Sequence, residues 1–372
     1  METPRFAPLP DSLPETVPFT GPEAIERRRG GAFAARLGAN ENGFGPSPRA
    51  IAAMAEAAAE AWKYGDPDNH DLKFALAAHL GVTPDHVTVG EGIDALLGNL
   101  VRLMIAPGDA VVTSNGAYPT FNYHVNGFGG DLYRVPYRDD HEDPAALMAE
   151  AARVGARLVY LANPDNPMGS WVTDAEIQVA LNALPPGCLL ILDEAYVEFA
   201  PPEAVPRISV DDPRVIRMRT FSKAYGMAGA RIGYAFGAPA LIRGFDRIRN
   251  HFGVNRIAQA GALAALADSG WLAQTRANVA RARNRLGAIA ADNGLTALPS
   301  ATNFVAIDCG HDGDFARRVL VALSDAGIFA RMPGVAPMDR CIRVSCGPDD
   351  QLDLFAKALP DALRQAGQTP RR

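Results

Sequence analysis

The stretch that decides the fold is TFSKAYGMAGARIGY, residues 220–234, in which Lys223 stands between a serine and an alanine. An apolar run over 215–218 comes shortly before the lysine and predicts a strand that ends there. A lysine taken alone indicates only an exposed surface residue, because lysines are seldom buried without a function. The neighbouring segments therefore decide whether Lys223 is functional.

Short β-prone runs alternate with helical stretches through the first two-thirds of the chain. Repeated alternation of this kind predicts a mostly parallel sheet with helices on both faces, and hence an α/β fold. The expected strands are 86–89, 110–113, 132–135, 157–161, 189–192 and 215–219. Long helices are expected over 241–267 and 271–292, followed by a smaller α+β unit.

The length of 372 residues exceeds what one hydrophobic core usually fills, so more than one domain is expected. We expect an N-terminal arm with part of the small domain over 1–45, a large cofactor-binding domain over 46–250 and a small C-terminal domain over 251–372. A short helix is expected near 22–29, within the arm.

Composition excludes several classes of function. The net charge of −6 argues against a nucleic-acid surface, and no apolar run reaches membrane-spanning length. The four cysteines show no paired CxxC spacing, and the histidines show no metal-binding grouping, so no metal is expected. A readable signal peptide is also absent, and the cytoplasm is the expected compartment.

Polar residues follow the expected strands, at the edge where open parallel sheets bind ligands. These segments are GEGID over 90–94, AYPTF over 117–121, NPDNPMG over 163–169, DEAY over 193–196 and TFSK over 220–223. Together they offer a phosphate cradle at a helix N-terminus, an aromatic ring, an amide, a carboxylate, a tyrosine and a lysine. Each has an ordinary structural explanation, but the combination is what pyridoxal phosphate requires: a lysine amine for its aldehyde, a carboxylate for its ring nitrogen and donors for its phosphate.

The same motifs resemble a known family. TFSKAYGMAGARIGY is similar to the lysine signature of fold-type I pyridoxal-phosphate aminotransferases. LDEAYVEF, NPDNPMG and RLGANENGFGPSP resemble the matching stretches of histidinol-phosphate aminotransferases, in the same order along the chain. The resemblance extends from about residue 37 to 363 and implies a large domain with a sheet sandwiched by helices, and a smaller α+β domain.

The resemblance also implies a role for each cofactor-site residue. Lys223 would be the Schiff-base lysine and proton shuttle, and Asp193 the partner of the pyridine nitrogen. Asn166 and Tyr196 would bond the phenolic oxygen of the ring. The remaining cofactor contacts would be Gly92, Ile93, Asp94, Thr220, Ser222 and Arg231 around the phosphate, Phe121 stacked on the ring, and Tyr64 reaching the phosphate from a neighbouring subunit of a homodimer.

Substrate contacts follow from the same resemblance. Arg343, in CIRVSCG, would grip the substrate carboxylate, and Arg331, in IFARMPG, would meet the substrate phosphate, although Arg340 is close enough in sequence to compete for that role. Asn42 is a further expected substrate contact, and Asn303, in SATNF, resembles a motif asparagine at the edge of the site. The substrates would be a small-molecule amino acid and a 2-oxo acid, with 2-oxoglutarate as acceptor.

Two departures and three alternatives remain open at this point. Met168 stands where the family usually has threonine, and EGID replaces the commoner phosphate-turn pattern. An aromatic-amino-acid aminotransferase and an amino-acid-phosphate decarboxylase would use the same machinery. The effector-sensing domain of a transcription regulator would need a fused DNA-binding module, and only about 45 non-basic residues precede the resemblance.

Overall fold

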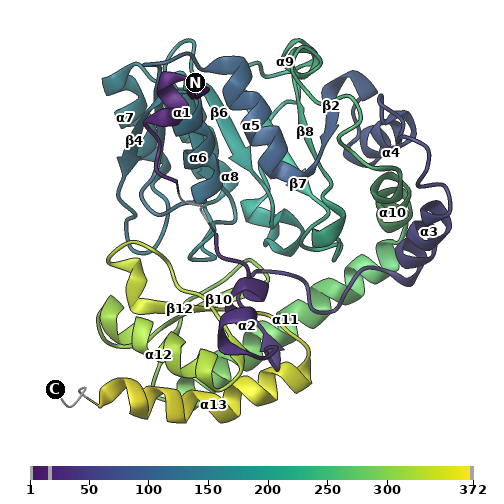
Figure 1. The fold of residues 1–372 in the computed structure, drawn as a ribbon. Coiled ribbons are helices and arrows are strands. Elements are labelled where there is room, and N and C mark those ends of the chain that lie inside the picture. Colours follow the sequence, from purple (N-terminus) through teal and green to yellow (C-terminus); the bar gives the residue numbers. More distant parts are fainter. Residues whose placement is uncertain (1–2, 16–18, 369–372) are drawn as a thin grey trace.

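The computed structural model describes residues 3–15 and 19–368, which form a large and a small domain side by side (Figure 1). A seven-stranded sheet in the order β2-β8-β7-β6-β5-β3-β4 forms the centre of the large domain. Its strands are β2 (Val87–Gly90), β3 (Ala110–Ser114), β4 (Asp131–Val135), β5 (Leu158–Ala162), β6 (Leu189–Asp193), β7 (Val215–Thr220) and β8 (Gly233–Gly237). Strand β8 runs antiparallel to both of its neighbours, β2 and β7, and the other neighbouring pairs are parallel. The predicted α/β class with a mostly parallel sheet is confirmed.

Helices cover both faces of this sheet because its central strands are apolar on both sides. Leu158 and Tyr160 of β5 pack in one hydrophobic cluster with α5 (Gly92–Met104) and α6 (Pro119–Gly127). Val159 and Leu161 face the opposite cluster, with α7 (Pro144–Val154) and α8 (Asp174–Ala183). This alternation explains the two layers of helices, and the parallel pairing of β5, β6 and β7 places their carboxyl ends at a single edge of the sheet between these layers.

The prediction of one long helix over 241–267 is wrong, because the segment contains two helices separated by an irregular stretch. The first is α9 (Pro239–Phe245), and the second is α10 (Arg256–Ala267). Asn255 begins the second, since its side chain accepts a hydrogen bond from the backbone N–H of Ala258 at 2.8 Å. Helix α10 packs against α3 (Pro48–Ala58) and α4 (His70–Leu80).

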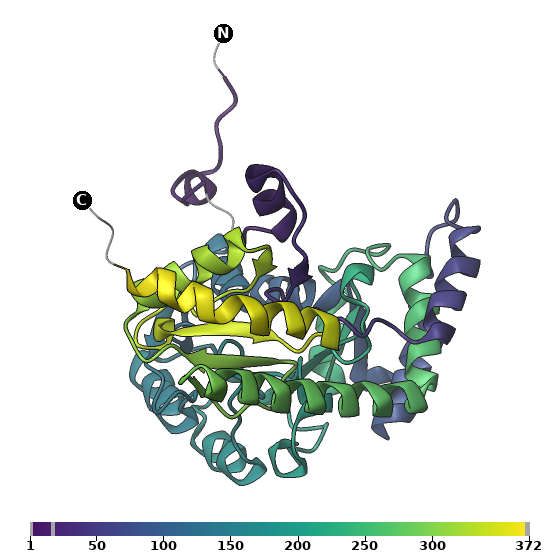
Figure 2. The ribbon, with the colours of Figure 1, turned by 90° about the horizontal axis from the view of Figure 1, so that it is seen from below.

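The small domain is an α+β unit reached through the long helix α11 (Ser269–Asp292). Strands β9 (Thr296–Ala297), β10 (Phe304–Asp308) and β12 (Cys341–Ser345) form an antiparallel sheet in the order β12-β10-β9. The long helix α13 (Asp349–Gly367) runs across this domain beside α12 (Gly313–Asp325), as Figure 2 shows. The N-terminal segment carries α1 (Pro8–Asp11) and the expected helix α2 (Pro22–Arg29), and its strand β1 (Ala35–Arg36) pairs with β11 (Ile328–Phe329).

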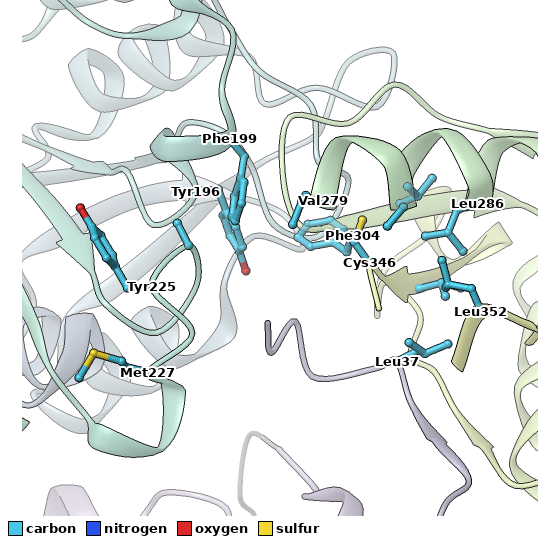
Figure 3. Close-up of a cluster of buried hydrophobic side chains, with 14 of the residues drawn as sticks. Leu37, Tyr196, Phe199, Tyr225, Met227, Val279, Leu286, Phe304, Cys346 and Leu352 are labelled. Atoms are coloured by element: carbon cyan, nitrogen blue, oxygen red, sulfur yellow. The ribbon is translucent and has the colours of Figure 1, made fainter. Parts of the chain in front are cut away.

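One continuous apolar cluster joins the two domains. In Figure 3, Tyr196, Phe199 and Tyr225 of the large domain lie in line with Phe304 and Leu286 of the small one. The ring of Tyr196 meets that of Phe304 edge to face, with centroids 5.5 Å apart. Because Tyr196 follows β6 directly, the domain junction lies against the functional edge of the sheet. In the described part of the chain, no helix is long and apolar enough to cross a membrane.

Candidate active site

A cavity of about 350 Å³ lies at the carboxyl ends of the parallel strands, between the two domains. The large domain contributes residues at or after the ends of β2, β3, β5, β6 and β7, the N-terminal segment contributes residues near Phe19 and Asn40, and the small domain contributes Arg331 and Arg343. Nine of the residues singled out from the sequence line it together with these arginines: Ile93, Asp94, Asn166, Asp193, Tyr196, Thr220, Ser222, Lys223 and Arg231. The cavity can therefore hold a ligand that touches both domains at once.

Lys223 is partly buried in this cavity, and of the four lysines in the sequence it is the one that lines it. Its Nζ donates a hydrogen bond to the carbonyl oxygen of Asn40 at 3.2 Å and lies 5.7 Å from the ring centroid of Tyr196. Burial, together with the positive charges of Arg343 and Arg231, lowers the pKa of Lys223 to about 8. A larger fraction of this amine is therefore uncharged near neutral pH than of an ordinary lysine, as nucleophilic and proton-transfer roles require.

Asp193 ends β6 and is 5% exposed, so its carboxylate requires partners. Oδ2 accepts a hydrogen bond from the hydroxyl of Tyr160 at 2.7 Å, and Oδ1 accepts one from the backbone N–H of Ala195 at 2.9 Å. Burial raises the pKa of Asp193 to about 6 although both hydrogen bonds oppose the shift. The carboxylate is held in a fixed position and would be stabilised by a cationic partner.

An anion cradle surrounds the N-terminus of α5. The first N–H groups of a helix have no partner within the helix, and the helix dipole favours an anion at this end. Arg231 lies over this terminus, with Nη1 3.5 Å from Ser222 Oγ and Nη2 3.7 Å from Asp94 Oδ2. Gly92 has φ +83°, and a Cβ on it would lie 2.6 Å from Nη2 of Arg231. Glycine at position 92 therefore makes room for the arginine beside the helix terminus.

The two arginines of the small domain lie opposite each other. Arg331 and Arg343 form an isolated antiparallel bridge, in which the N–H of Arg343 donates to the carbonyl of Arg331 at 2.6 Å. Arg343 is 8% exposed, and its Nη1 and Nη2 donate to Asn166 Oδ1 at 2.5 Å and to the carbonyl of Gly38 at 3.4 Å. Burial lowers the pKa of Arg343 to about 10, and no described carboxylate forms an ion pair with it. A buried guanidinium bonded only to neutral oxygens is a ready anion-binding group.

The expectation that Phe121 stacks on a ligand ring is wrong. Phe121 is fully buried in α6, and its ring stacks on the core face of Tyr160 with centroids 4.7 Å apart. Tyr118, which precedes Pro119 at the start of the helix, lines the cavity instead and donates from its hydroxyl to Asp94 Oδ1. The sequence predicts an aromatic residue from this segment at the site. Which ring faces the cavity depends on where α6 begins, and no local pattern fixes that residue.

Asn42 is likewise not a cavity residue. Its Nδ2 donates to the carbonyl of Ala224 at 3.2 Å and its Oδ1 accepts from the N–H of Phe44 at 3.1 Å, so both ends of the amide stabilise the loop. Asn40 lines the cavity in its place and donates from Nδ2 to the hydroxyl of Tyr196 at 3.1 Å. Asn303 supports this loop by donating to the carbonyl of Asn40 at 3.0 Å.

Arg340 and Tyr64, two further expected contacts, lie outside the cavity. Arg340 does not line the cavity, because its guanidinium is bonded to Asp140 and Asp308. Tyr64 lies outside the cavity too, 77% exposed and packed against Phe252, so a contact made by Tyr64 across a subunit boundary stays a prediction. Met168, the departure from threonine, is buried against the small domain in a cluster with Ala306 and Met338.

Comparison with known proteins identifies the family. The model of the aminotransferase class I and II family matches residues 35–359. The chain belongs to this family. It is 35% identical to the histidinol-phosphate aminotransferase of Moorella thermoacetica, covering 95% of this chain and 91% of the relative, and 37% identical to that of Anaeromyxobacter sp., covering 92% and 95%.

The crystal structure of a histidinol-phosphate aminotransferase from Sinorhizobium meliloti in complex with pyridoxal 5′-phosphate is similar throughout. It shares 56% identity and a TM-score of 0.95 with this aminotransferase, with 98% of each chain covered. The predicted fold type, cofactor and enzyme class are confirmed: the protein is a pyridoxal-phosphate-dependent aminotransferase. The lysine, the buried carboxylate and the anion cradle described above fit the aldehyde, ring nitrogen and phosphate of this cofactor.

Proposed function

We propose that this aminotransferase takes the amino group of histidinol phosphate and passes it to 2-oxoglutarate. The observation that carries the proposal is the pair of arginines, Arg343 and Arg331, which face one cavity from adjacent backbone positions. Histidinol phosphate has a phosphate ester on the carbon next to its reacting carbon, and 2-oxoglutarate has a carboxylate bonded directly to its reacting carbon. One anion site must serve both, and two guanidinium groups suit a phosphate dianion as well as a carboxylate.

The names of the relatives support the same donor, because histidinol-phosphate aminotransferases from several bacteria are similar to this chain over most of its length. The wall of the cavity supports it as well. Phe19 and Tyr118 lie with ring centroids 6.1 Å apart, and both line the cavity, with Arg331 over the ring of Phe19 at 5.3 Å. Such a wall suits a planar imidazole beside an anionic group.

Each large-domain residue then has a proposed role. Lys223 would hold the cofactor through its aldehyde, and the bound cofactor would supply the electron sink that stabilises negative charge at the substrate α-carbon. Asp193 would pair with the cationic ring nitrogen, and Tyr196 and Asn166 would bond the ring oxygen. Thr220, Ser222, Arg231 and the N-terminus of α5 at Gly92, Ile93 and Asp94 would hold the phosphate.

The proton transfers fall to Lys223. With the substrate bound, Nζ of Lys223 would remove the proton from the α-carbon of the substrate. The lowered pKa of Lys223, about 8, makes it an effective base near neutral pH. A positioned base of this kind contributes about 10² to 10⁴-fold to the rate. Arg343 holds the substrate anion meanwhile, so that the α-proton stays within reach of Nζ.

We further propose a homodimer in which Tyr64 completes the partner's phosphate site. Trp62, Tyr64 and Phe252 are 78%, 77% and 53% exposed, and apolar surface of this extent indicates a covered face. Tyr64→Phe should weaken cofactor binding while sedimentation velocity still gives the mass of a dimer. Unchanged cofactor affinity in that variant would remove Tyr64 from the proposed site.

The donor is tested by mixing the holoenzyme separately with histidinol phosphate and with phenylalanine, and recording the cofactor absorbance as it passes from the pyridoxal to the pyridoxamine form. The acceptor is tested by adding 2-oxoglutarate to the pyridoxamine form, which should restore the absorbance of the pyridoxal form. We expect fast, saturable conversion with histidinol phosphate, lost in Arg331→Gln, and slow conversion with phenylalanine. Preference for phenylalanine would make the protein an aromatic-amino-acid aminotransferase. Carbon dioxide release from an amino-acid phosphate would make it a decarboxylase.

A further inference from the structure

Arg340 is the basic residue near the substrate arginines for which the proposed reaction has no use. It ends the short 3-10 helix η5 (Met338–Arg340) and precedes β12, three residues before Arg343. Its Nε donates to Asp308 Oδ2 of β10 at 2.7 Å, within the small domain. Its Nη1 and Nη2 donate to both oxygens of Asp140 in the large domain, at 3.0 and 2.7 Å. One guanidinium therefore joins the two domains.

We propose that Arg340 is a positioning residue, which fixes the small domain where Arg343 and Arg331 face the reacting cofactor. The two prongs of the guanidinium match the two oxygens of Asp140, a geometry that defines orientation as well as distance. The ion pair is about three-quarters buried on both sides, so water and salt screen it less than an exposed pair. The ion pair also fixes the position of Arg343, because Arg340 immediately precedes β12 and Arg343 lies within that strand.

We call the two-pronged ion pair between Arg340 and Asp140 the clamp. Its large-domain residue, Asp140, lies on a constrained turn. Asp139 and Asp140 have φ of 51° and 64°, and Arg138 and His141 exchange both backbone hydrogen bonds, at 2.9 and 3.0 Å. A two-residue hairpin turn with both central residues left-handed favours glycine or asparagine, and a pair of aspartates there is unusual. Strained backbone persists where the surroundings hold it, and here it presents the carboxylate of Asp140 to Arg340.

Apolar contacts beside the clamp leave little room for other arrangements. Met338 packs against the loop that follows β3, where a Cβ on Gly116 would lie 2.5 Å from its Cε. Met168 and Ala306 join Met338 in one buried cluster across the same boundary. The polar clamp and the apolar contact therefore flank the segment that leads into β12. Between them they fix the end of the strand that carries Arg343.

Loss of the clamp should affect substrate binding and leave the cofactor site intact. The proposed cofactor residues lie in the large domain, whereas Arg343 and Arg331 move with the small one. If only part of the population holds the small domain in place, the apparent affinity for substrate falls by that fraction. Residues within one salt-bridge network couple strongly enough for roughly a tenfold effect.

The experiment compares Arg340→Gln, Asp140→Asn and the double variant as holoenzymes, with stopped-flow conversion of the cofactor by L-glutamate and by histidinol phosphate. Glutamate keeps the test independent of the proposed donor, so failure with histidinol phosphate alone would count against the substrate and not against the clamp. Asp212→Asn is the matched control, because Asp212 makes a two-pronged pair with Arg214 inside the large domain, at 3.0 and 2.8 Å.

We expect roughly a tenfold rise in half-saturating concentration for each single variant, a limiting rate within about threefold of wild type, and unchanged cofactor absorbance. The half-saturating concentration of the double variant should not exceed that of the more impaired single variant. That of Arg340→Lys should lie between those of wild type and Arg340→Gln. If Arg340→Gln fails to fold, Asp140→Asn carries the same expectation, since it keeps the bond from Arg340 to Asp308. A lower melting temperature with unchanged half-saturation, or an equal effect of Asp212→Asn, would reduce Arg340 to a structural role and overturn the proposal.

Discussion

Replacing Tyr160 with phenylalanine tests how the protein controls the charge of Asp193. The change removes the hydroxyl that donates to Asp193 Oδ2 at 2.7 Å and leaves the N–H of Ala195 as the other described donor. A hydrogen bond to a charged group contributes about 1.5–3 kcal/mol, and one pKa unit corresponds to about 1.4 kcal/mol. The pKa of Asp193 in the cofactor-free protein should therefore rise from about 6 by roughly 1–2 units.

The consequence is a shift in the pH dependence of cofactor binding. The proposed pairing with the cationic ring nitrogen needs Asp193 ionised, so a protonated Asp193 must lose its proton before the cofactor binds. The affinity for the cofactor is highest at pH values above the pKa that Asp193 has in the cofactor-free protein, and it falls as the pH drops through that pKa. Wild-type protein should lose affinity below about pH 6, and Tyr160→Phe should do so about 1–2 units higher.

The assay is a titration of cofactor-free protein with pyridoxal phosphate between pH 5.5 and about 9, followed by absorbance. Tyr225→Phe is the control, because Tyr225 is buried and lies outside the cavity. At pH 9 the variant and wild type should agree, since Asp193 is ionised in both. Identical pH profiles for wild type and Tyr160→Phe would refute the reasoning, because the hydroxyl of Tyr160 would then not lower the pKa of Asp193.

Three further changes test other parts of the site. Lys223→Ala should abolish transamination while circular dichroism shows an intact fold, and near-normal turnover would contradict the role of the lysine. Gly92→Ala places a Cβ 2.6 Å from Nη2 of Arg231 at φ +83°, so cofactor affinity should fall by about tenfold or more in an equilibrium titration, whereas Gly108→Ala, at an open turn with φ +88°, should not change it. Arg343→Gln keeps a hydrogen bond to Asn166 but removes the charge, and kcat/KM for anionic substrates should fall about 10²-fold or more, with little change for cofactor binding.

Local patterns predicted the sheet well. All six expected strands are present, with ends within about two residues of the prediction, because apolar runs bounded by turn residues leave few alternatives. Strand β8 was not predicted, since its short sequence GYAFG follows the lysine motif without a clear boundary. The helix expected over 241–267 failed for a related reason. Its apolar periodicity continues past Gly253 and Asn255, where the chain turns before α10.

The site was predictable where chemistry follows directly from a strand end. Asp193 is the last residue of β6 and Lys223 follows shortly after β7, so fold topology alone brings them together. Tyr160 could not be found in this way, because it lies inside β5 and reaches Asp193 across the sheet. Asn40 and Asn42 are two residues apart in one loop, and only the packing of that loop against Ala224 and Tyr196 decides which one faces the cavity.

The domain limits proposed at 45/46 and 250/251 stay a prediction. The role of Arg340 shows why the sequence alone is ambiguous near the substrate site. Its distance of three residues from Arg343 suggested a rival for the substrate, but the partner that occupies it, Asp140, lies 200 residues away in the sequence. Contacts between domains of this kind leave no local pattern.

The central claim is that the amine of Lys223 carries the cofactor, and one measurement addresses it directly. The holoenzyme is reduced with borohydride, digested with trypsin and analysed by mass spectrometry. The account predicts a cofactor-derived mass on the peptide TFSKAYGMAGAR, residues 220–231, left uncut at the modified Lys223. The same mass on a peptide with Lys63, Lys73 or Lys357, or on no peptide at all, would contradict it.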